Sequence, residues 1–189
     1  MTTARAAAKA DRRAALLRAA ARLFAERGFD RVTLEDIGGA VGVSGPAVYR
    51  HFAGKQAILA AILVDASTGL LDGGRAVVDR VPDAAEALRE LVAFHVAFAV
   101  GNADVIRVQD RDLDSLGDPE RRRVRTLQRT YVELWVGVLA RLFPASPLPA
   151  LRARAHAAFG LMNSTPHSTA ASPELLASMA LAALNAAAG

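Results

Sequence analysis

A short stretch of the chain, Thr33 to Lys55, carries hydroxyl and basic side chains at close spacing. The hydroxyls of Thr33 and Ser44 can donate hydrogen bonds to phosphate oxygens, and Ser44 can also offer its backbone amide. Both residues are equally suited to cap the first turn of a helix, and capping is compatible with a phosphate contact. The stretch therefore predicts binding to phosphate groups.

Two cations of this stretch have more specific candidate roles. Arg50 can make a bidentate contact with guanine, although it could instead hold a phosphate. Lys55 is expected in the first turn of a helix, where the helix dipole disfavours a positive charge. A phosphate bound there by backbone amides and the ammonium group together would explain a lysine at this position. We therefore expect Lys55 to contact phosphate.

Gly45, Pro46 and Ala47 offer almost no hydrogen-bonding side chain. Any contact that they make with base edges must be apolar or steric, for example against thymine methyl groups. Glu35 is acidic and close to this surface. Its carboxylate could accept a hydrogen bond from a cytosine amino group, or it could face solvent.

The elements that must position these side chains are two short helices joined by a tight turn. Thr33 and Asp36 have the spacing of a capping box, so a helix begins after Thr33. Gly42 ends it, because glycine adopts the left-handed conformation without strain. Ser44 caps a second helix with Pro46 in its first turn. This pattern predicts a helix-turn-helix, whose second helix enters a DNA major groove.

The stretch resembles the DNA-binding signature of the TetR/AcrR family of bacterial transcriptional regulators. The resemblance implies that Tyr49 and His51 contact the DNA backbone. Gly38 and Val41 depart from the family pattern, which usually has alanine at both positions, and the departure is expected to loosen or repack the first helix. The matching residues are Gly28, Phe29, Thr33, Ile37, Gly42, Val43, Ser44, Tyr49, His51, Phe52 and Lys55.

Charge is distributed unevenly along the 189 residues. Residues 1–60 hold ten Lys or Arg and five Asp or Glu, whereas residues 61–189 hold thirteen and fourteen. The basic excess thus coincides with the helix-turn-helix, as DNA binding requires. The chain has no cysteine, which excludes disulfides and thiolate metal sites.

The whole chain is predicted to be all-α, with about nine helices and no strand alternation beside turn signals. Residues 1–54 are expected to form a three-helix DNA-binding domain, and 55–189 an effector-binding and dimerisation domain. The expected helices cover 11–27, 34–41, 45–52, 54–71, 83–100, 103–116, 119–143, 150–165 and 172 onward, with glycines at 69, 73 and 74 loosening the end of the fourth. Residues 1–9 are expected to be a mobile arm, either a disordered tail or a means for Arg5 and Lys9 to reach a phosphate or the minor groove.

The resemblance implies a ligand pocket in the second domain, and several apolar faces there carry a few polar groups. His95 lies in an apolar stripe, where it is either a core histidine with its hydrogen bonds satisfied or a ligand contact. The stretch FGLMNSTPHS, at which Pro166 should stop or kink a helix, supplies further donors and acceptors. The pocket candidates are Phe94, His95, Phe98, Tyr131, Trp135, Phe159, Met162 and Asn163.

The stretch RVQDRDLDSL followed by ERRRVRTLQR is rich in charges of both signs. Asp110, Asp112 and Asp114 are expected to pair with nearby arginines on a solvated surface. Alternatively, Arg107, Arg111 or Arg125 binds a phosphate-bearing ligand such as an acyl-CoA. Together with NSTPHS, the stretch resembles some actinobacterial TetR-type regulators linked to lipid or acyl-CoA metabolism.

The final helix has no charged residue from Leu175 onward, and residues 155–163 have none apart from a possible charge on His156. A helix without a charged face needs burial nearly all round. We therefore expect a homodimer formed by the last two helices, which is also the dimer that the resemblance implies. Such a dimer would place two helix-turn-helix units about 34 Å apart on a palindromic site.

The sequence thus favours a homodimeric repressor that a small apolar ligand releases from an operator in double-stranded DNA. The alternative is a constitutive DNA-binding regulator, or one that a protein partner controls. No histidine pair has metal-ligand spacing, and no nucleophile elbow or phosphate loop occurs, so neither an enzyme nor a cofactor or metal is expected. The sequence contains no pattern of signal-peptide type and no apolar run of about 20 residues, which predicts a cytoplasmic protein without membrane contact.

Overall fold

The computed structural model describes residues 4–167 and 172–186. All regular elements in these residues are helical, which confirms the predicted fold class. The helices are α1 (Ala4–Arg27), α2 (Leu34–Ala40), α3 (Gly45–Val48), α4 (Lys55–Arg80), α5 (Ala84–Gly101), α6 (Ala103–Asp112), the 3-10 turn η1 (Leu113–Ser115), α7 (Asp118–Leu142), α8 (Leu148–Met162), the 3-10 turn η2 (Thr165–His167) and α9 (Pro173–Asn185).

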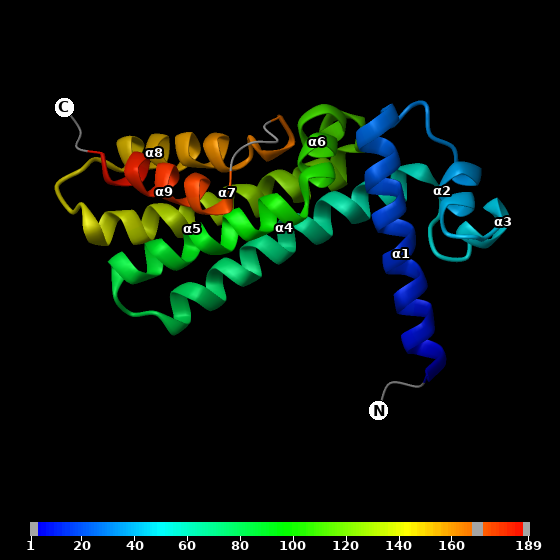
Figure 1. Ribbon diagram of the computed structural model, residues 1–189, viewed down its shortest axis with the longest axis horizontal. Coiled ribbons are helices and arrows are strands. Elements are labelled where there is room, and N and C mark those ends of the chain that lie inside the picture. Colours follow the sequence, from blue (N-terminus) through cyan, green and yellow to red (C-terminus); the bar gives the residue numbers. More distant parts are fainter. Residues whose placement is uncertain (1–3, 168–171, 187–189) are drawn as a thin grey trace.

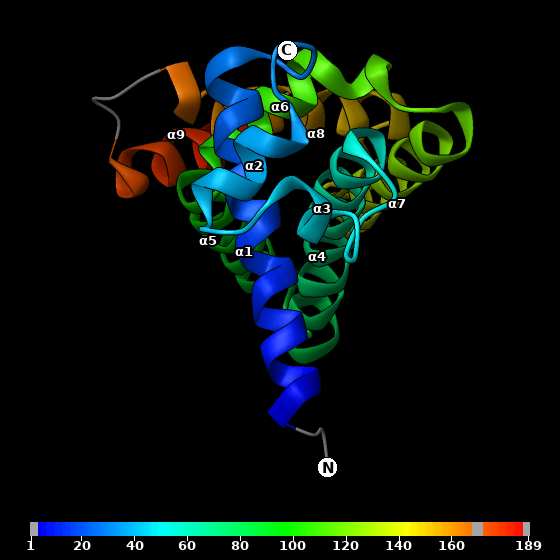
Figure 2. The same cartoon turned by 90° about the vertical axis from the view of Figure 1, so that its right-hand side faces the viewer.

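The helices form two groups at opposite ends of an elongated molecule. Figure 1 shows α1, α2 and α3 at one end and the bundle of α5, α7, α8 and α9 at the other. Helix α4 runs from the first group along the bundle, and α6 lies beside α1. The end-on view in Figure 2 shows α2 and α3 on the outside of the molecule.

Helix α1 begins earlier than predicted. The structure continues it back to Ala4, so the residues from Ala4 to Lys9 that were expected to be a mobile arm are helical. This part of the sequence, ARAAAK, consists mainly of alanine and other good helix formers, which explains the extension. Residues 1–3 lie outside the described part. At its other end the helix stops at Gly28, which has a φ of +88°.

Helix α4 is also longer than predicted, because it runs through Gly69, Gly73 and Gly74 to Arg80. The last two glycines serve close packing and do not loosen the helix. A Cβ atom at Gly73 would overlap the ring of Phe94, and one at Gly74 would lie 2.7 Å from the ring of Tyr131. Helices α5 and α7 therefore approach the backbone of α4 at a distance that only glycine permits.

Two hydrophobic cores meet along α4. The first combines α1 to α3 with the N-terminal part of α4, including Ile58 and Leu63, and Val108, Leu116 and Val124 complete it from α6 to α7. The second begins at Leu71 and includes α5, α7, α8 and α9. The predicted division at residues 54 and 55 remains a prediction, but the first core continues past it into α4.

By length and composition alone, helix α4 is long and apolar enough to cross a membrane. The bent pair α5 and α6 passes the same test as a broken span. Asp65 and Asp72 interrupt the apolar residues of α4, so the helix contains no uninterrupted apolar run of about 20 residues. The apolar composition of α4 has a structural reason, because its buried residues supply both cores.

The C-terminal helices follow the predicted punctuation. Helix α8 ends at Met162, shortly before Pro166, and α9 begins at Pro173 with the Ser172 hydroxyl accepting a hydrogen bond from the Leu175 amide. In α9 one face, including Leu176, Ala180 and Leu184, is buried against the rest of the chain. Leu175 and Met179 lie on another face and are about half exposed. Contacts within one chain therefore do not bury α9 on all sides.

Candidate functional site

The turn between α2 and α3 is tight because two glycines permit it. Gly42 has a φ of +70° in the left-handed region, as predicted. A Cβ atom at Gly38 would lie 2.7 Å from the Val43 carbonyl oxygen. The Val43 amide donates a 2.9 Å hydrogen bond to the Gly38 carbonyl. Gly38, where the family pattern usually has alanine, therefore lets the turn pack directly against α2.

Four of the nine residues predicted to contact DNA are exposed on α3 or directly beside its ends. Tyr49 is 60% exposed, and Arg50, Pro46 and Ser44 are exposed as well. Ser44 has the backbone conformation of a helix cap, but its hydroxyl makes no capping hydrogen bond. The hydroxyl therefore remains available to an external partner.

Two of the predicted α3 contacts are partly or fully covered. Ala47 is half-buried, and Gly45 is buried beneath the side chain of Glu35 from α2. A Cβ atom at Gly45 would lie 2.8 Å from the Glu35 carboxylate oxygen Oε1. Any contact between Gly45 and a base therefore requires the Glu35 side chain to move.

Thr33 and Lys55 already have internal partners. The Thr33 hydroxyl accepts from the Asp36 amide at 3.1 Å and the Thr33 amide donates to the Asp36 carboxylate at 2.8 Å, which completes the predicted capping box. The hydroxyl also donates to this carboxylate at 2.7 Å. The Lys55 ammonium donates to the carbonyl oxygens of Phe29 and Asp30, at 2.8 and 3.2 Å. It also lies 4.4 Å from the centre of the Phe29 ring. An ammonium group has three N–H donors, so these two carbonyls leave one donor of Lys55 unused.

A basic groove of about 540 Å³ separates α3 from the N-terminal half of α1. Its lining includes Lys9, Arg12, Arg50 and His51. Sequence reasoning did not select Arg12, although it lies one helical turn from Lys9. The His51 Nδ1 atom is buried without a hydrogen-bond partner. Lys9 and Arg50, which are 41 residues apart in the sequence, thus line the same groove because α1 is a continuous helix from Ala4.

The second candidate site is built around His95, a side chain on α5 that is 2% exposed. Its Nε2 atom lies 3.1 Å from the Asn163 Oδ1 atom, and its Nδ1 atom lies 3.3 Å from the Tyr131 hydroxyl. A neutral imidazole satisfies both contacts, donating from Nε2 and accepting at Nδ1. Burial lowers the pKa of His95 to about 4 and raises the pKa of Tyr131 above its ordinary value. Both groups are therefore neutral near pH 7.

Aromatic rings surround this pair. The ring centres of Tyr131, Trp135 and Phe159 lie 5.0 to 6.1 Å from that of His95. The Trp135 indole Nε1 atom is buried without a hydrogen-bond partner, and its ring centre lies 6.1 Å from that of Tyr131. Helices α5, α7 and α8 thus bring most of the predicted pocket residues into one cluster.

A cavity of about 210 Å³ opens on one side of this cluster. Four predicted residues line it, namely His95, Tyr131, Phe159 and Asn163. The other four lie elsewhere. Trp135 and Met162 are fully buried in the core behind it, Phe94 packs against Gly73, and Phe98 faces a separate surface groove. Sequence reasoning missed Ser67, Gln109 and Gln128, which are polar residues of the same wall.

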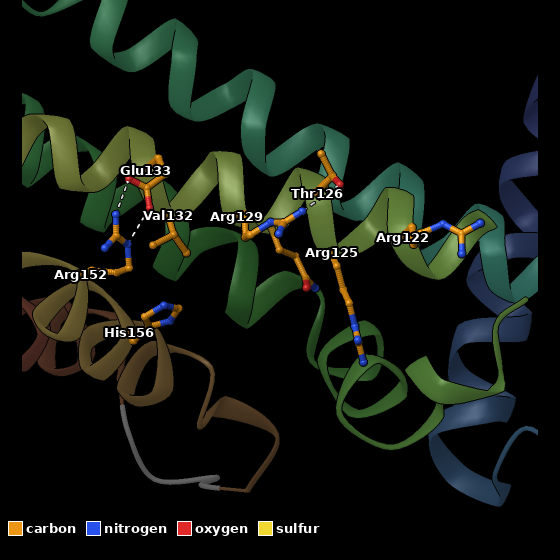
Figure 3. A pocket seen from close by; sticks show the side chains of 9 residues that line it. Arg122, Arg125, Thr126, Arg129, Val132, Glu133, Arg152 and His156 are labelled. Carbon is orange, nitrogen blue, oxygen red and sulfur yellow. Dashed lines mark hydrogen bonds and ion pairs between the residues drawn. The ribbon is translucent and has the colours of Figure 1, made fainter. Parts of the chain in front are cut away.

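A larger groove of about 650 Å³ lies next to the cavity, between α7 and α8. The cavity and the groove share Gln128, Val132 and His156 in their linings. Figure 3 shows Arg122, Arg125 and Arg129 along α7, with Arg152 and Glu133 joined by an ion pair at one end. The helical spacing of the three α7 arginines was visible in the sequence, but only Arg125 was selected.

The other two arginines proposed to bind phosphate have internal roles. Arg107 donates to the Pro166 carbonyl at 2.6 Å, and Arg111 donates to carbonyls at the end of α1. Asp112 and Asp114 pair with Arg111 and Arg125, as predicted. However, the Asp112 side chain is buried, in contrast to the solvated surface that was expected. Among the described residues, no group of three or more His, Asp or Glu could hold a metal ion.

Comparisons with known proteins match both ends of the molecule. The family model for bacterial regulatory proteins of the tetR family matches residues 16–62. The model for the tetracyclin repressor-like C-terminal domain matches residues 81–167. The HTH-type transcriptional repressor KstR2 of Rhodococcus jostii is 32% identical over 132 residues, which are 69% of this chain and 65% of that protein. The match thus spans just under two thirds of the length of this relative.

Solved structures share the fold. A TetR-family transcriptional regulator from Bordetella parapertussis superposes with a TM-score of 0.82 at 23% identity, over 92% of this chain and 93% of that one. AibR, in complex with isovaleryl coenzyme A and operator DNA, superposes with a TM-score of 0.78 at 18% identity, over 92% and 97% of the two chains. With both family models matched in order along the sequence, the chain belongs to the TetR family of bacterial regulatory proteins.

Proposed function

We propose that this protein is a homodimeric, cytoplasmic transcriptional repressor that binds a palindromic DNA operator and is released from it by an acyl-CoA-type ligand. The DNA-binding part of the proposal rests on the exposed face of α3. Ser44, Tyr49 and Arg50 present polar groups to solvent there, beside a groove that also contains Lys9 and Arg12. A positively charged surface of this kind suits the phosphates that flank a major groove.

The dimer is proposed from the exposed apolar side chains of the last two helices. Leu148 at the start of α8 is 55% exposed, and Leu175 and Met179 on α9 are 51% and 47% exposed. Leu175 and Met179 are four residues apart and so share one face of α9. An apolar face of this kind suits a two-fold interface between two copies of the chain.

The observation that carries the ligand proposal is the continuity of the cavity beside His95 with the arginine-lined groove. An acyl chain would occupy the cavity beside Phe159 and His95, and the phosphates of the coenzyme would lie against Arg122, Arg125 and Arg129. A cavity of about 210 Å³ is below the usual range of ligand pockets, about 300–1,000 Å³, and so favours a short acyl chain. AibR, which has the same fold, was solved with a short acyl-CoA and its operator.

Release would follow from a shift between two geometries of the dimer. A ligand changes DNA affinity only if it binds one geometry more tightly than the other. Filling the cavity between α5, α7 and α8 would change the packing of the bundle along α4. Helix α4 also carries part of the core of the DNA-binding end, so the change would reach α3.

The test is a titration of the protein bound to a fluorescently labelled operator with isovaleryl-CoA, free coenzyme A and free isovalerate. We expect release by the thioester alone. The variant Arg125→Ala/Arg129→Ala should need at least tenfold more thioester, whereas Arg75→Ala, an exposed arginine at the far end of α4, should behave as wild type. Release by no member of a series of acyl-CoAs would remove the ligand proposal.

The second candidate function is a regulator without a small-molecule effector. Its supporting observation is the closed hydrogen-bond network of His95, Tyr131 and Asn163, which leaves little for a ligand to satisfy. Unchanged operator binding across the acyl-CoA series would favour this candidate.

A further inference from the structure

The continuous helix α4 is the first connection between the DNA-binding end and the bundle. The second connection begins with α6, which packs against α1 (Figure 1) and contributes Val108 to the first core, and it continues through Leu116 to Val124 of α7. The angle of α1 to the bundle is therefore fixed by side-chain contacts with α6 as well as by the backbone of α4.

Arg111 makes the polar contacts of this second connection. Its guanidinium group donates to the carbonyl oxygens of Phe24 and, at 3.4 Å, of Ala25. Both carbonyls belong to the last turn of α1, where the Phe24 carbonyl also accepts a 2.8 Å hydrogen bond from the amide of Gly28, just beyond the helix. A positive charge is favourable at this end of a helix. Arg111 thus caps α1 from another part of the chain, 86 residues away in sequence.

Asp112 fixes the orientation of this arginine. Its carboxylate accepts two hydrogen bonds from Arg111, each 3.0 Å long, and its side chain is only 8% exposed. A buried carboxylate needs a charged partner, and the bidentate pairing holds the planar guanidinium group in one orientation. The remaining N–H groups of Arg111 then point toward the α1 carbonyls.

The same helix reaches the candidate ligand cavity. Gln109, two residues before Arg111, lines the cavity next to His95. Arg107 donates to the carbonyl of Pro166, which follows the cavity residue Asn163. A ten-residue helix thus joins the cavity wall at one side and the end of α1 at the other.

We propose that Arg111, held by Asp112, is a positioning residue that fixes the angle between α1 and the bundle and thereby the operator half-site spacing that the dimer accepts. The inference rests on the proposed DNA-binding dimer, because only a dimer contacts two half-sites at once and so depends on the distance between them. In a two-fold dimer the two α3 helices must lie about one DNA turn apart, about 34 Å, so a small rotation of each DNA-binding end changes the match with the operator. Arg111 itself makes no contact with DNA in this account.

The test is a spacing profile. The operator selected by the wild-type protein is rebuilt with one or two base pairs added or removed between its half-sites, and binding of each duplex is measured. The wild-type protein should lose at least about 30-fold in affinity for a change of one base pair. Arg111→Gln should bind all spacings within about fivefold of one another. The slope of log affinity against log salt should not change, because no phosphate contact is lost.

Two further variants and one control make the result unambiguous. Asp112→Asn leaves the arginine in place without its charged partner and should flatten the profile partly, and Arg111→Lys should restore little, because lysine cannot make the bidentate contact. Arg89→Gln removes an exposed arginine from α5 and should keep the wild-type profile. Equal spacing profiles for Arg111→Gln and wild type would overturn the inference. Absence of any selected operator for the wild type would instead refute the proposed function.

Discussion

The candidate polar side chains are exposed at the DNA-binding end of the molecule and buried in the bundle. On the α3 surface, Ser44, Tyr49 and Arg50 are exposed, and the Ser44 hydroxyl makes no capping bond. In the bundle, His95 and Tyr131 are buried and hydrogen-bonded to each other, with Asn163 on the other side of His95. The exposed set is suited to a large polar partner. The buried set is already paired, so a ligand would have to fill space beside it.

One feature of the bundle runs against this division, namely the exposed apolar face of α9. If the dimer covers this face, the combined variant Leu175→Asp/Met179→Asp should be monomeric and lose at least about 100-fold in operator affinity, because the two half-sites would no longer be bound together. Analytical ultracentrifugation and operator titration measure the two effects. Leu184 is not a suitable site for this test, since it is buried in the protomer core. An intact dimer would show that α9 is not the interface.

The buried network predicts a specific dependence of stability on pH. Burial lowers the pKa of His95 to about 4 from 6.5, so between these values the unfolded state binds more protons than the folded state. The contribution of His95 is therefore complete above pH 6.5 and is lost as the pH falls toward 4. From pH 7 to pH 5 the free energy of unfolding should fall by about 2 kcal/mol on this account.

The matched variant is His95→Gln, which can hydrogen-bond but does not titrate. Urea unfolding of both proteins at pH 7 and pH 5 isolates the effect, because the exposed His156 is present in each. The variant should lose about 2 kcal/mol less than wild type over this interval. Parallel losses in the two proteins would mean that His95 is not a neutral buried group.

Lys55 combines features of the exposed and the buried polar residues, because two internal carbonyls accept hydrogen bonds from its ammonium group and one N–H donor remains. Lys55→Met should lower the free energy of unfolding by about 1–2 kcal/mol, because charged hydrogen bonds to Phe29 and Asp30 are lost. If Lys55 also contacts phosphate, the salt slope of operator binding should decrease by about 0.9 for each subunit. A stability loss with an unchanged slope would assign Lys55 an internal role only.

The smallest expected effects distinguish the two hydroxyl residues, Thr33 and Ser44. Thr33→Ala should cost about 1 kcal/mol of stability, because the capping box is lost. Ser44→Ala should leave stability within about 0.5 kcal/mol of wild type but weaken operator binding several-fold. Thermal unfolding and operator titration of both variants test this contrast, and equal stability losses would contradict it.

Local sequence signals predicted the elements, and long-range packing accounts for what they missed. The capping box at Thr33, the turn at Gly42 and the stop before Pro166 all depend on neighbouring residues, and each appears in the structure. The length of α4 could not be derived in this way. Gly73 and Gly74 weaken a helix in isolation, but here Phe94 and Tyr131 pack against them from helices distant in sequence.

The candidate sites show the same limit. Helical periodicity identified His95 and Tyr131 as residues of one cluster. It could not distinguish the wall of the cavity from the core behind it, where Trp135 is fully buried. Charge density indicated ion pairs for the segment around Arg111, with phosphate binding as the alternative, and the pair with Asp112 is present. Residues adjacent in the sequence do not indicate that Arg111 contacts the carbonyl groups of Phe24 and Ala25, which lie more than 80 residues earlier in the chain.

The central claim, a dimer that binds a specific operator, is tested most directly by selecting bound sequences from random duplex DNA with the purified protein. The account predicts an enriched palindrome whose half-sites lie about one helical turn apart, or at an offset that two adjacent dimers explain. Weak, salt-sensitive binding without an enriched motif would contradict it, because the exposed face of α3 would then contact phosphates without distinguishing bases.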